Sequence, residues 1–136
     1  MSLVTRAAGF VGTPYRLMGR TPEGWDCWGC VSWLRQQLLE VASPSAGDGY
    51  LPEDAVGGRL IDTSAGLIAA SLGRWRLLDG PRPGAVALIE VFGRPAHVGL
   101  VLDRRAFIHA WEGTDTVIER LSDERWARRA RGFYDA

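Results

Sequence analysis

The sequence contains no lysine: its 16 basic residues are all arginine, and 16 acidic residues balance them to a net charge of zero. A neutral chain argues against binding to nucleic acid through phosphate neutralisation. No apolar stretch approaches the ~20 residues that a membrane span needs. We therefore expect no nucleic-acid partner and no membrane insertion.

Cysteine and histidine are scarce, with two of each in the chain. A structural zinc site usually needs four such ligands at short, recognisable spacings, and no second close pair exists here. We expect neither a metal nor a cofactor. Residues 1–15 contain one arginine and no continuous apolar core, so they do not resemble a signal peptide. This predicts synthesis in the cytoplasm, where cysteines normally stay reduced.

The order of apolar patterns predicts an α+β fold in which N-terminal helices pack on a C-terminal antiparallel β-sheet. The length of 136 residues suits one domain spanning 1–136. Ser2 caps a first predicted helix, a second begins at Asp26 or Cys27 and ends before Ser43-Pro44, and a third covers 63–72. Segments 13–25 and 43–60 are predicted loops. The predicted strands cover 85–92, 97–102, 105–111, 116–121 and 132–135, and Ser122 caps a short helix before the last of them.

Both cysteines lie in the stretch GWDCWGC, residues 24–30, at the start of the second predicted helix. A Cys-x-x-Cys pair at a helix N-terminus resembles a redox motif, although such pairs normally follow a β-strand and this one follows a loop. The alternative is a single nucleophile. Cys27 stands at the helix start, where the helix dipole stabilises a thiolate, while Cys30 lies one turn inward as a small buried hydrophobe.

A nucleophilic cysteine needs a base, and only His97 and His109 are available. They fall on consecutive predicted strands joined by a tight turn at 103–104. Antiparallel pairing through that turn places residues whose numbers sum to about 207 opposite each other. His97 would then face His109 or its immediate neighbours, and this geometry favours a Cys–His site.

Five segments resemble the NlpC/P60 family of cysteine peptidases in order and spacing. They are GTPYR (12–16), GRTPEGWDCWG (19–29), PGAVA (83–87), HVGLVL (97–102) and FIHA (107–110). The resemblance implies a papain-like NlpC/P60 fold and cleavage of peptide bonds in peptidoglycan stem peptides, typically between D-glutamate and diaminopimelate.

Residue by residue, the resemblance implies that Cys27 is the nucleophile, His97 the base and His109 the residue that orients the base. It further implies that Tyr15 and Asp26 lie close to the nucleophile. Backbone amides around Cys27 and Trp28 would stabilise an oxyanion. With these roles, Cys27 and His97 are expected to form an ion pair.

Two departures from the family pattern separate this chain from its common members. Trp28 replaces a small residue beside the nucleophile, and Leu17-Met18 replaces the usual Trp-Gly. Both changes, and segment 91–121, resemble the branch found in phage tails and gene transfer agents. That branch implies tail-tip or hub partners, carriage in the particle, and action in the periplasm or cell wall. Exposed aromatics among Trp25, Trp28, Trp75 and Trp111 would serve such contacts. The alternatives are a non-catalytic tail module that keeps the fold, and an amidase acting on another substrate.

Overall fold

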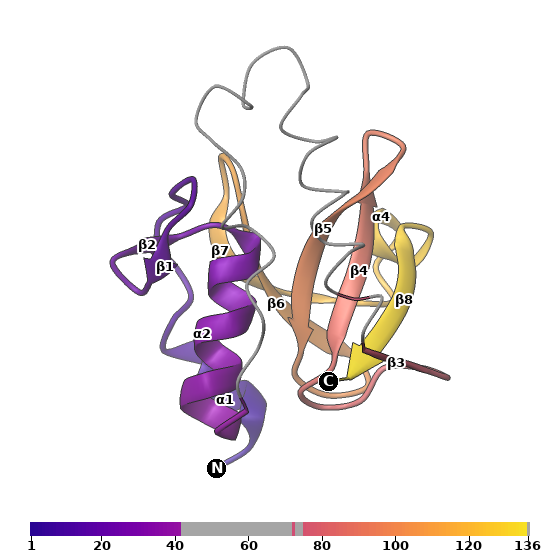
Figure 1. Ribbon diagram of the computed structural model, residues 1–136, viewed down its shortest axis with the longest axis horizontal. Coiled ribbons are helices and arrows are strands. Elements are labelled where there is room, and N and C mark those ends of the chain that lie inside the picture. The colour runs from indigo at the N-terminus through magenta and orange to yellow at the C-terminus, as the bar shows by residue number, and fades with distance from the viewer. Residues whose placement is uncertain (42–71, 73–74, 136) are drawn as a thin grey trace.

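The computed structural model describes residues 1–41, 72 and 75–135 of the chain. It contains an N-terminal helical part beside an antiparallel sheet, which confirms the predicted α+β class (Figure 1). The loop predicted over 43–60 lies outside the described residues, as does the third predicted helix apart from Leu72. No helix within the described ranges is long and apolar enough to cross a membrane.

Two N-terminal helices begin where the sequence predicts. Helix α1 (Leu3–Ala8) starts after Ser2, whose hydroxyl accepts a hydrogen bond from the Thr5 amide, as a helix cap should. Helix α2 (Cys27–Leu39) starts after Asp26, which is its cap. It ends a few residues earlier than predicted, because Glu40 adopts a left-handed conformation with φ of 55°.

The connection between the two helices is not a plain loop. It contains a small hairpin made of β1 (Arg20–Thr21) and β2 (Gly24–Trp25). Trp25 is fully buried, and its indole N–H donates to the Thr116 hydroxyl at 2.7 Å. The hairpin is therefore anchored to the main sheet as well as to α2.

The main sheet has six strands in the order β3-β8-β4-β5-β6-β7. Their bounds are β3 Arg76–Leu78, β4 Val86–Val91, β5 Arg94–Val101, β6 Ala106–Trp111, β7 Asp115–Arg120 and β8 Ala130–Asp135. The β4–β7 meander confirms the predicted hairpins. Strand β3 was not predicted, and the last strand does not extend the meander but inserts between β3 and β4.

The short helix before the last strand is α4 (Glu124–Ala127), and its cap is Asp123 rather than the predicted Ser122. The Asp123 carboxylate accepts the Arg125 amide at 2.9 Å. The chain is still tied to the sheet at Leu121, whose amide donates to the Arg105 carbonyl, and this delays the helix start.

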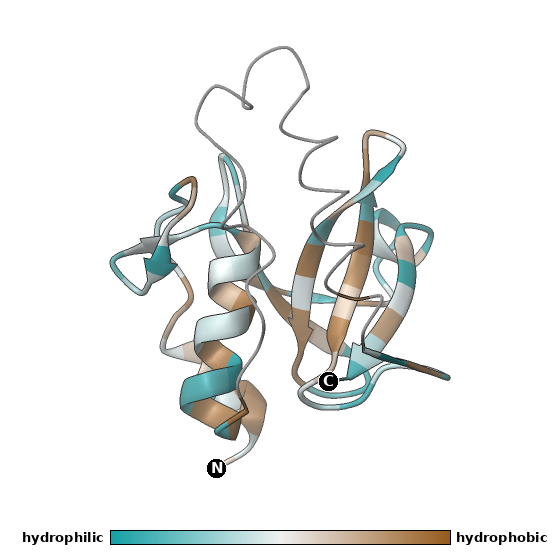
Figure 2. Cartoon of the chain, viewed as in Figure 1, coloured by the Kyte–Doolittle hydropathy of each residue, from teal (hydrophilic) through white to brown (hydrophobic). Residues whose placement is uncertain are grey.

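Apolar residues run along the central strands (Figure 2). Because successive side chains of a strand point to opposite faces, each face of the sheet carries its own core. On one face, α2 contributes Val31 and Leu34 to the cluster formed with Val98 and Leu100. On the opposite face, Phe107 packs with Trp126 of α4 and neighbouring small and branched side chains. Burying each such side chain contributes about 1.5–3 kcal/mol, which ties both helices firmly to the sheet.

Candidate active site

The strands β5 and β6 separate at one end of the sheet. Their backbone pairing stops at Leu100 and Ile108, although both strands continue past this pair. The Leu102 amide donates to the Ala106 carbonyl of β6. Since alternate amides of an antiparallel strand point to the same neighbour, the Val98 amide also points towards β6. Beyond the last pair, that amide needs another acceptor.

The acceptor is the Cys27 sulfur, to which the backbone of Val98 donates. The Trp28 amide at the start of α2 also points at this sulfur. The first residue of α2 therefore lies at the opening between β5 and β6, directly beside the backbone of His97. Cys27 keeps partial solvent exposure, whereas Cys30 is fully buried in the core, as predicted for a small hydrophobe.

Asp26 fixes the position of the helix start. One of its carboxylate oxygens accepts the Gly29 amide and an Arg20 guanidinium N–H, each at 2.8 Å, and the other accepts the Met18 amide at 3.2 Å. Asp26 is buried, so these hydrogen bonds replace its lost hydration. The carboxylate thus joins the preceding loop to the first turn that carries Cys27.

Gly29 explains part of the Asp-Cys-x-Gly pattern. A Cβ at this position would collide with the Gly19 carbonyl oxygen and crowd the Trp25 side chain. The absence of a side chain lets the loop pack directly on the first turn of α2, which keeps Cys27 and its neighbouring amides in place.

His97 and His109 meet on the far side of the opening, on the sheet face that α4 covers. His97 Nε2 and His109 Nδ1 are 2.7 Å apart, and both side chains are 1% exposed. The β5–β6 pairs sum to 208, so the predicted register is wrong by one residue. His109 therefore stands level with Gly99, and the two imidazoles meet diagonally. Among the described residues, no hydrogen bond joins the His97 ring to the Cys27 thiol.

A third residue, Glu119, completes this arrangement and was missed in the sequence. Its Oε2 lies 2.6 Å from His109 Nε2, while its Oε1 lies 3.4 Å from the Arg125 guanidinium. The signal was present in the hairpin: His109 pairs with Val117, so Glu119 occupies the diagonal position on the same face. The resulting side-chain chain runs from His97 through His109 to Glu119.

Burial sets the charge states at the site. Desolvation, followed by the nearby Asp26 carboxylate, raises the pKa of the Cys27 thiol to about 12. Desolvation and the neighbouring His109 lower the pKa of His97 well below its ordinary value. Both shifts favour a neutral thiol and a neutral imidazole over the expected ion pair.

The side chain of Tyr15 lies near Cys27, whereas the side chain of Trp28 is buried in the core. Burial, and then the proximity of Cys27, raise the pKa of the Tyr15 hydroxyl, so Tyr15 does lie near the nucleophile position. The Trp28 side chain instead points into the core, where its ring packs 6.1 Å from that of Trp75. Of the four tryptophans that were candidates for exposed contacts, Trp25, Trp28 and Trp75 are buried, and Trp111 alone of the four keeps partial exposure.

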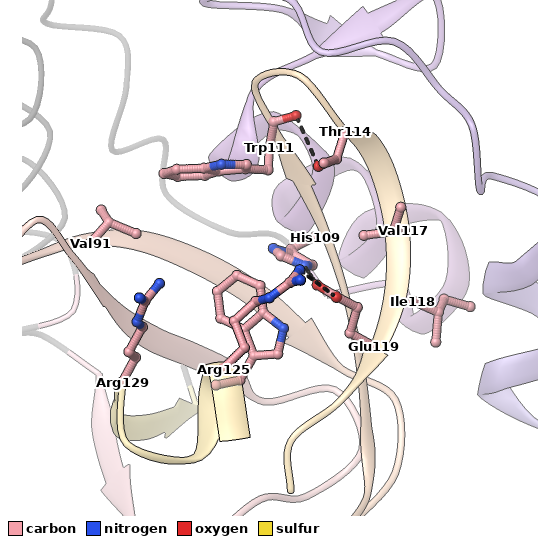
Figure 3. Close-up of a pocket in the computed structure, with 10 residues that line it drawn as sticks. Val91, His109, Trp111, Thr114, Val117, Ile118, Glu119, Arg125 and Arg129 are labelled. Atoms are coloured by element: carbon pink, nitrogen blue, oxygen red, sulfur yellow. Dashed lines mark hydrogen bonds and ion pairs between the residues drawn. The ribbon is translucent and has the colours of Figure 1, made fainter. Parts of the chain in front are cut away.

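A pocket of about 500 Å³ opens on the β6–β7 and α4 side of the two histidines (Figure 3). Its titratable lining residues are His109, Glu119, Arg125 and Arg129. Glu119 has 23% of its side chain exposed here. The carboxylate end of the His97–His109–Glu119 chain is therefore open to solvent, while the imidazoles are not.

The sequence profile described as the NlpC/P60 family matches residues 12–134. A probable peptidoglycan endopeptidase, LytE of Bacillus subtilis, is 28% identical over 96% of this chain and 32% of its own length. A gamma-DL-glutamyl hydrolase of the same organism is 25% identical over 96% of this chain and 28% of its own length. The chain thus spans about a third of the length of these relatives.

Solved structures share the fold. An NlpC/P60 family protein from Bacillus cereus superposes with a TM-score of 0.69 over 98% of this chain and 39% of that protein, at 16% identity. At this identity the likeness concerns the fold alone, and it agrees with the helix-then-sheet arrangement described above.

Proposed function

The chain belongs to the NlpC/P60 family, and on this premise we propose that it is a cysteine peptidase that cleaves stem peptides of peptidoglycan. The observation that carries the proposal is the position of Cys27. It meets the backbone of β5 beside His97, at the opening where His97 and His109 are hydrogen-bonded.

The first step is removal of the thiol proton. His97 Nε2 is engaged by His109, which leaves Nδ1 to accept the proton from Cys27. Since the resting pair is neutral, His97 acts as a general base as the sulfur attacks, rather than as the partner of a preformed thiolate. The attack converts the scissile carbonyl into a tetrahedral oxyanion bound to sulfur.

We expect the amides at the start of α2, including that of Trp28, to donate to this oxyanion. Collapse of the intermediate breaks the C–N bond, and His97 returns its proton to the leaving amine. Water then hydrolyses the thioester, which releases the acid product and restores the Cys27 thiol. The steps need no metal or redox partner.

The bond that we propose is the D-glutamyl–diaminopimelate bond. Support comes from two relatives, one named as a peptidoglycan endopeptidase and the other as a gamma-DL-glutamyl hydrolase. The first name describes cleavage within peptidoglycan and the second describes hydrolysis of a glutamyl bond, and the proposed bond is a glutamyl bond within peptidoglycan.

The test is digestion of diaminopimelate-type peptidoglycan by the purified protein, with released peptides identified by mass spectrometry. We expect D-glutamyl cleavage that Cys27→Ala abolishes and that Cys30→Ala, the matched control within the same helix, largely retains. An active Cys27→Ala protein would refute the mechanism. Release of peptides cut at another bond would support the peptidase activity but refute the proposed substrate bond.

A non-catalytic module is the second candidate, because no hydrogen bond among the described residues joins the His97 ring to the Cys27 thiol, whose pKa desolvation raises. A module of this kind leaves peptidoglycan intact at every pH, and its wild-type and Cys27→Ala forms are indistinguishable. If the protein is a peptidase, the wild type cleaves peptidoglycan and Cys27→Ala does not, at any pH where the His97 imidazole is neutral. The same digestion, repeated from pH 6 to pH 9, therefore decides between the two candidates.

We further propose that the protein works at the tail tip of a phage or gene transfer agent, against tail or hub proteins, and acts in the periplasm or cell wall. Support comes from the resemblance of segment 91–121 and of Trp28 to that branch. Mass spectrometry of purified particles tests this proposal: the protein should co-purify with tails. Its exclusion from particles would refute the tail role without affecting the peptidase.

A further inference from the structure

Glu119 is the one acidic group that contacts the buried histidine pair among the described residues, and nothing in the proposed reaction so far uses it. It approaches His109 Nε2 at 2.6 Å from β7, inside the pocket of Figure 3. Its second oxygen faces Arg125 of α4 at 3.4 Å. Arg129, which lines the same pocket, is the other charged group on this side.

The hydrogen-bond chain restricts the tautomers of both histidines. An ionised carboxylate can only accept, so His109 must carry its proton on Nε2. Burial lowers the pKa of His109, so the ring is neutral and its Nδ1 has a lone pair. The 2.7 Å contact then requires His97 to donate from Nε2. A neutral His97 that is protonated on Nε2 has its free lone pair on Nδ1.

We propose that Glu119 is a positioning residue that sets the tautomers of His109 and His97, so that His97 offers an unprotonated Nδ1 to Cys27. This inference rests on the proposed role of His97 as the base. During proton transfer, His97 Nδ1 gains the thiol proton and Nε2 keeps its own. His109 and Glu119 then face the resulting imidazolium through two aligned hydrogen bonds, which stabilise its charge.

An ordinary surface ion pair does not account for this geometry. The partner Arg125 is exposed for 61% of its side chain and stands 3.4 Å away, so that contact alone contributes little. The contact to His109 is much shorter, and the histidine is 1% exposed. The carboxylate is therefore held mainly by the imidazole, at the point where the pocket meets the core.

The first variant is Glu119→Gln, which keeps size but not charge. Arg125 can only donate, so it should take the amide oxygen and turn the amide nitrogen towards His109 Nε2. That nitrogen donates, which forces the opposite tautomer on His109 and then on His97. The His97 Nδ1 would carry a proton and lose its function as a base. We expect kcat/KM to fall at least ~10-fold, because a catalytic histidine held in the wrong tautomer cannot act as a base.

The double variant Glu119→Gln with Arg125→Ala sharpens the test. Without Arg125, the amide oxygen is free to turn back to His109, so part of the lost activity and the native tautomers should return. A purely structural role of Glu119 predicts the reverse, with the double variant weaker than the single one. Glu124→Gln, an exposed carboxylate on α4, serves as the charge-matched control and should behave as wild type.

Two readouts work without substrate and so separate this inference from the proposed function. Nitrogen-15 NMR of the imidazoles reports which ring nitrogen carries the proton. The rate of Cys27 alkylation reports whether His97 can accept the proton of the thiol. We expect Glu119→Gln to invert both tautomers and slow alkylation, and the double variant to reverse both effects. Unchanged tautomers and alkylation in Glu119→Gln would overturn the inference, whether or not the wild-type protein cleaves peptidoglycan.

Discussion

The start of α2 and the His97–His109–Glu119 chain hold buried polar groups at the same opening of the sheet, but by different means. Around Asp26, the contacts are backbone amides and one arginine within residues 18–29. Around His109, they are side chains from three strands and α4. The first region fixes the position of the nucleophile through the local backbone, whereas the second fixes proton positions through strand register.

This difference predicts that the two regions fail separately. Damage to the helix start should destabilise the fold and displace Cys27, yet leave the two histidines hydrogen-bonded. Damage to the histidine chain should change protonation with little loss of stability. The three variants and conditions below test this separation, from the largest expected effect to the smallest.

Gly29→Ala should have the largest effect on stability. The new methyl group would collide with the Gly19 carbonyl oxygen, which belongs to the backbone and cannot rotate away. Overpacking of this kind costs about 1–3 kcal/mol or more in the free energy of unfolding, measured by urea denaturation. Gly9→Ala is the control, because its nearest neighbour, the Arg6 carbonyl oxygen, is 4.0 Å from the added carbon. Equal stability of the two variants would show that the loop and α2 are not rigidly packed.

The sequence predicted the first region better than the second, for the same physical reason. The start of α2 depends on neighbours in the chain, so the sequence placed it at Asp26 or Cys27, although the role of Asp26 as the cap came only from the structure. The contact of Glu119 with His109 depends on the register of β6 and β7. The sequence suggested that these strands pair, but it did not show which residues of the pair would touch. The central position of β8 depends on a choice between distant strands that no local pattern contains.

Charge states were the least predictable property. The helix start and a nearby histidine suggested an ion pair of Cys27 and His97, because both favour a thiolate in a solvated site. In the structure, desolvation raises the pKa of Cys27 and lowers the pKa of His97. Both shifts disfavour the charged forms that an ion pair needs. Burial is a property of the assembled sheet and helix, so it was not available from the spacing of residues.

Substitutions of Asp26 should separate its structural role from its electrostatic one. Asp26→Ala removes the helix cap, which typically costs about 0.5–2 kcal/mol of stability. Asp26→Asn keeps an oxygen for the Gly29 amide but removes the negative charge, which is the second cause of the raised Cys27 pKa. Asp26→Asn should therefore be less destabilising and should also alkylate faster at neutral pH. Alkylation no faster than in the wild type would show that Asp26 acts on Cys27 only through the fold.

The effect that is smallest at neutral pH concerns the histidine chain, whose contribution to stability changes only as the pH falls. Burial lowers the pKa of both His97 and His109 below the value of about 6.5 expected in the unfolded chain. The unfolded state therefore binds more protons below this pH, so stability is complete above pH 6.5 and declines as the pH falls. The slope approaches about 1.4 kcal/mol per pH unit for each histidine that stays neutral in the fold. Glu119 opposes the effect at His109, so His97 should dominate the pH dependence.

Urea denaturation between pH 5 and pH 7 tests this prediction. The free energy of unfolding of His97→Gln should depend less steeply on pH than that of the wild type, while the pH dependence of Gly29→Ala should be unchanged. A slope that His97→Gln leaves unaltered would place the acid sensitivity elsewhere in the molecule.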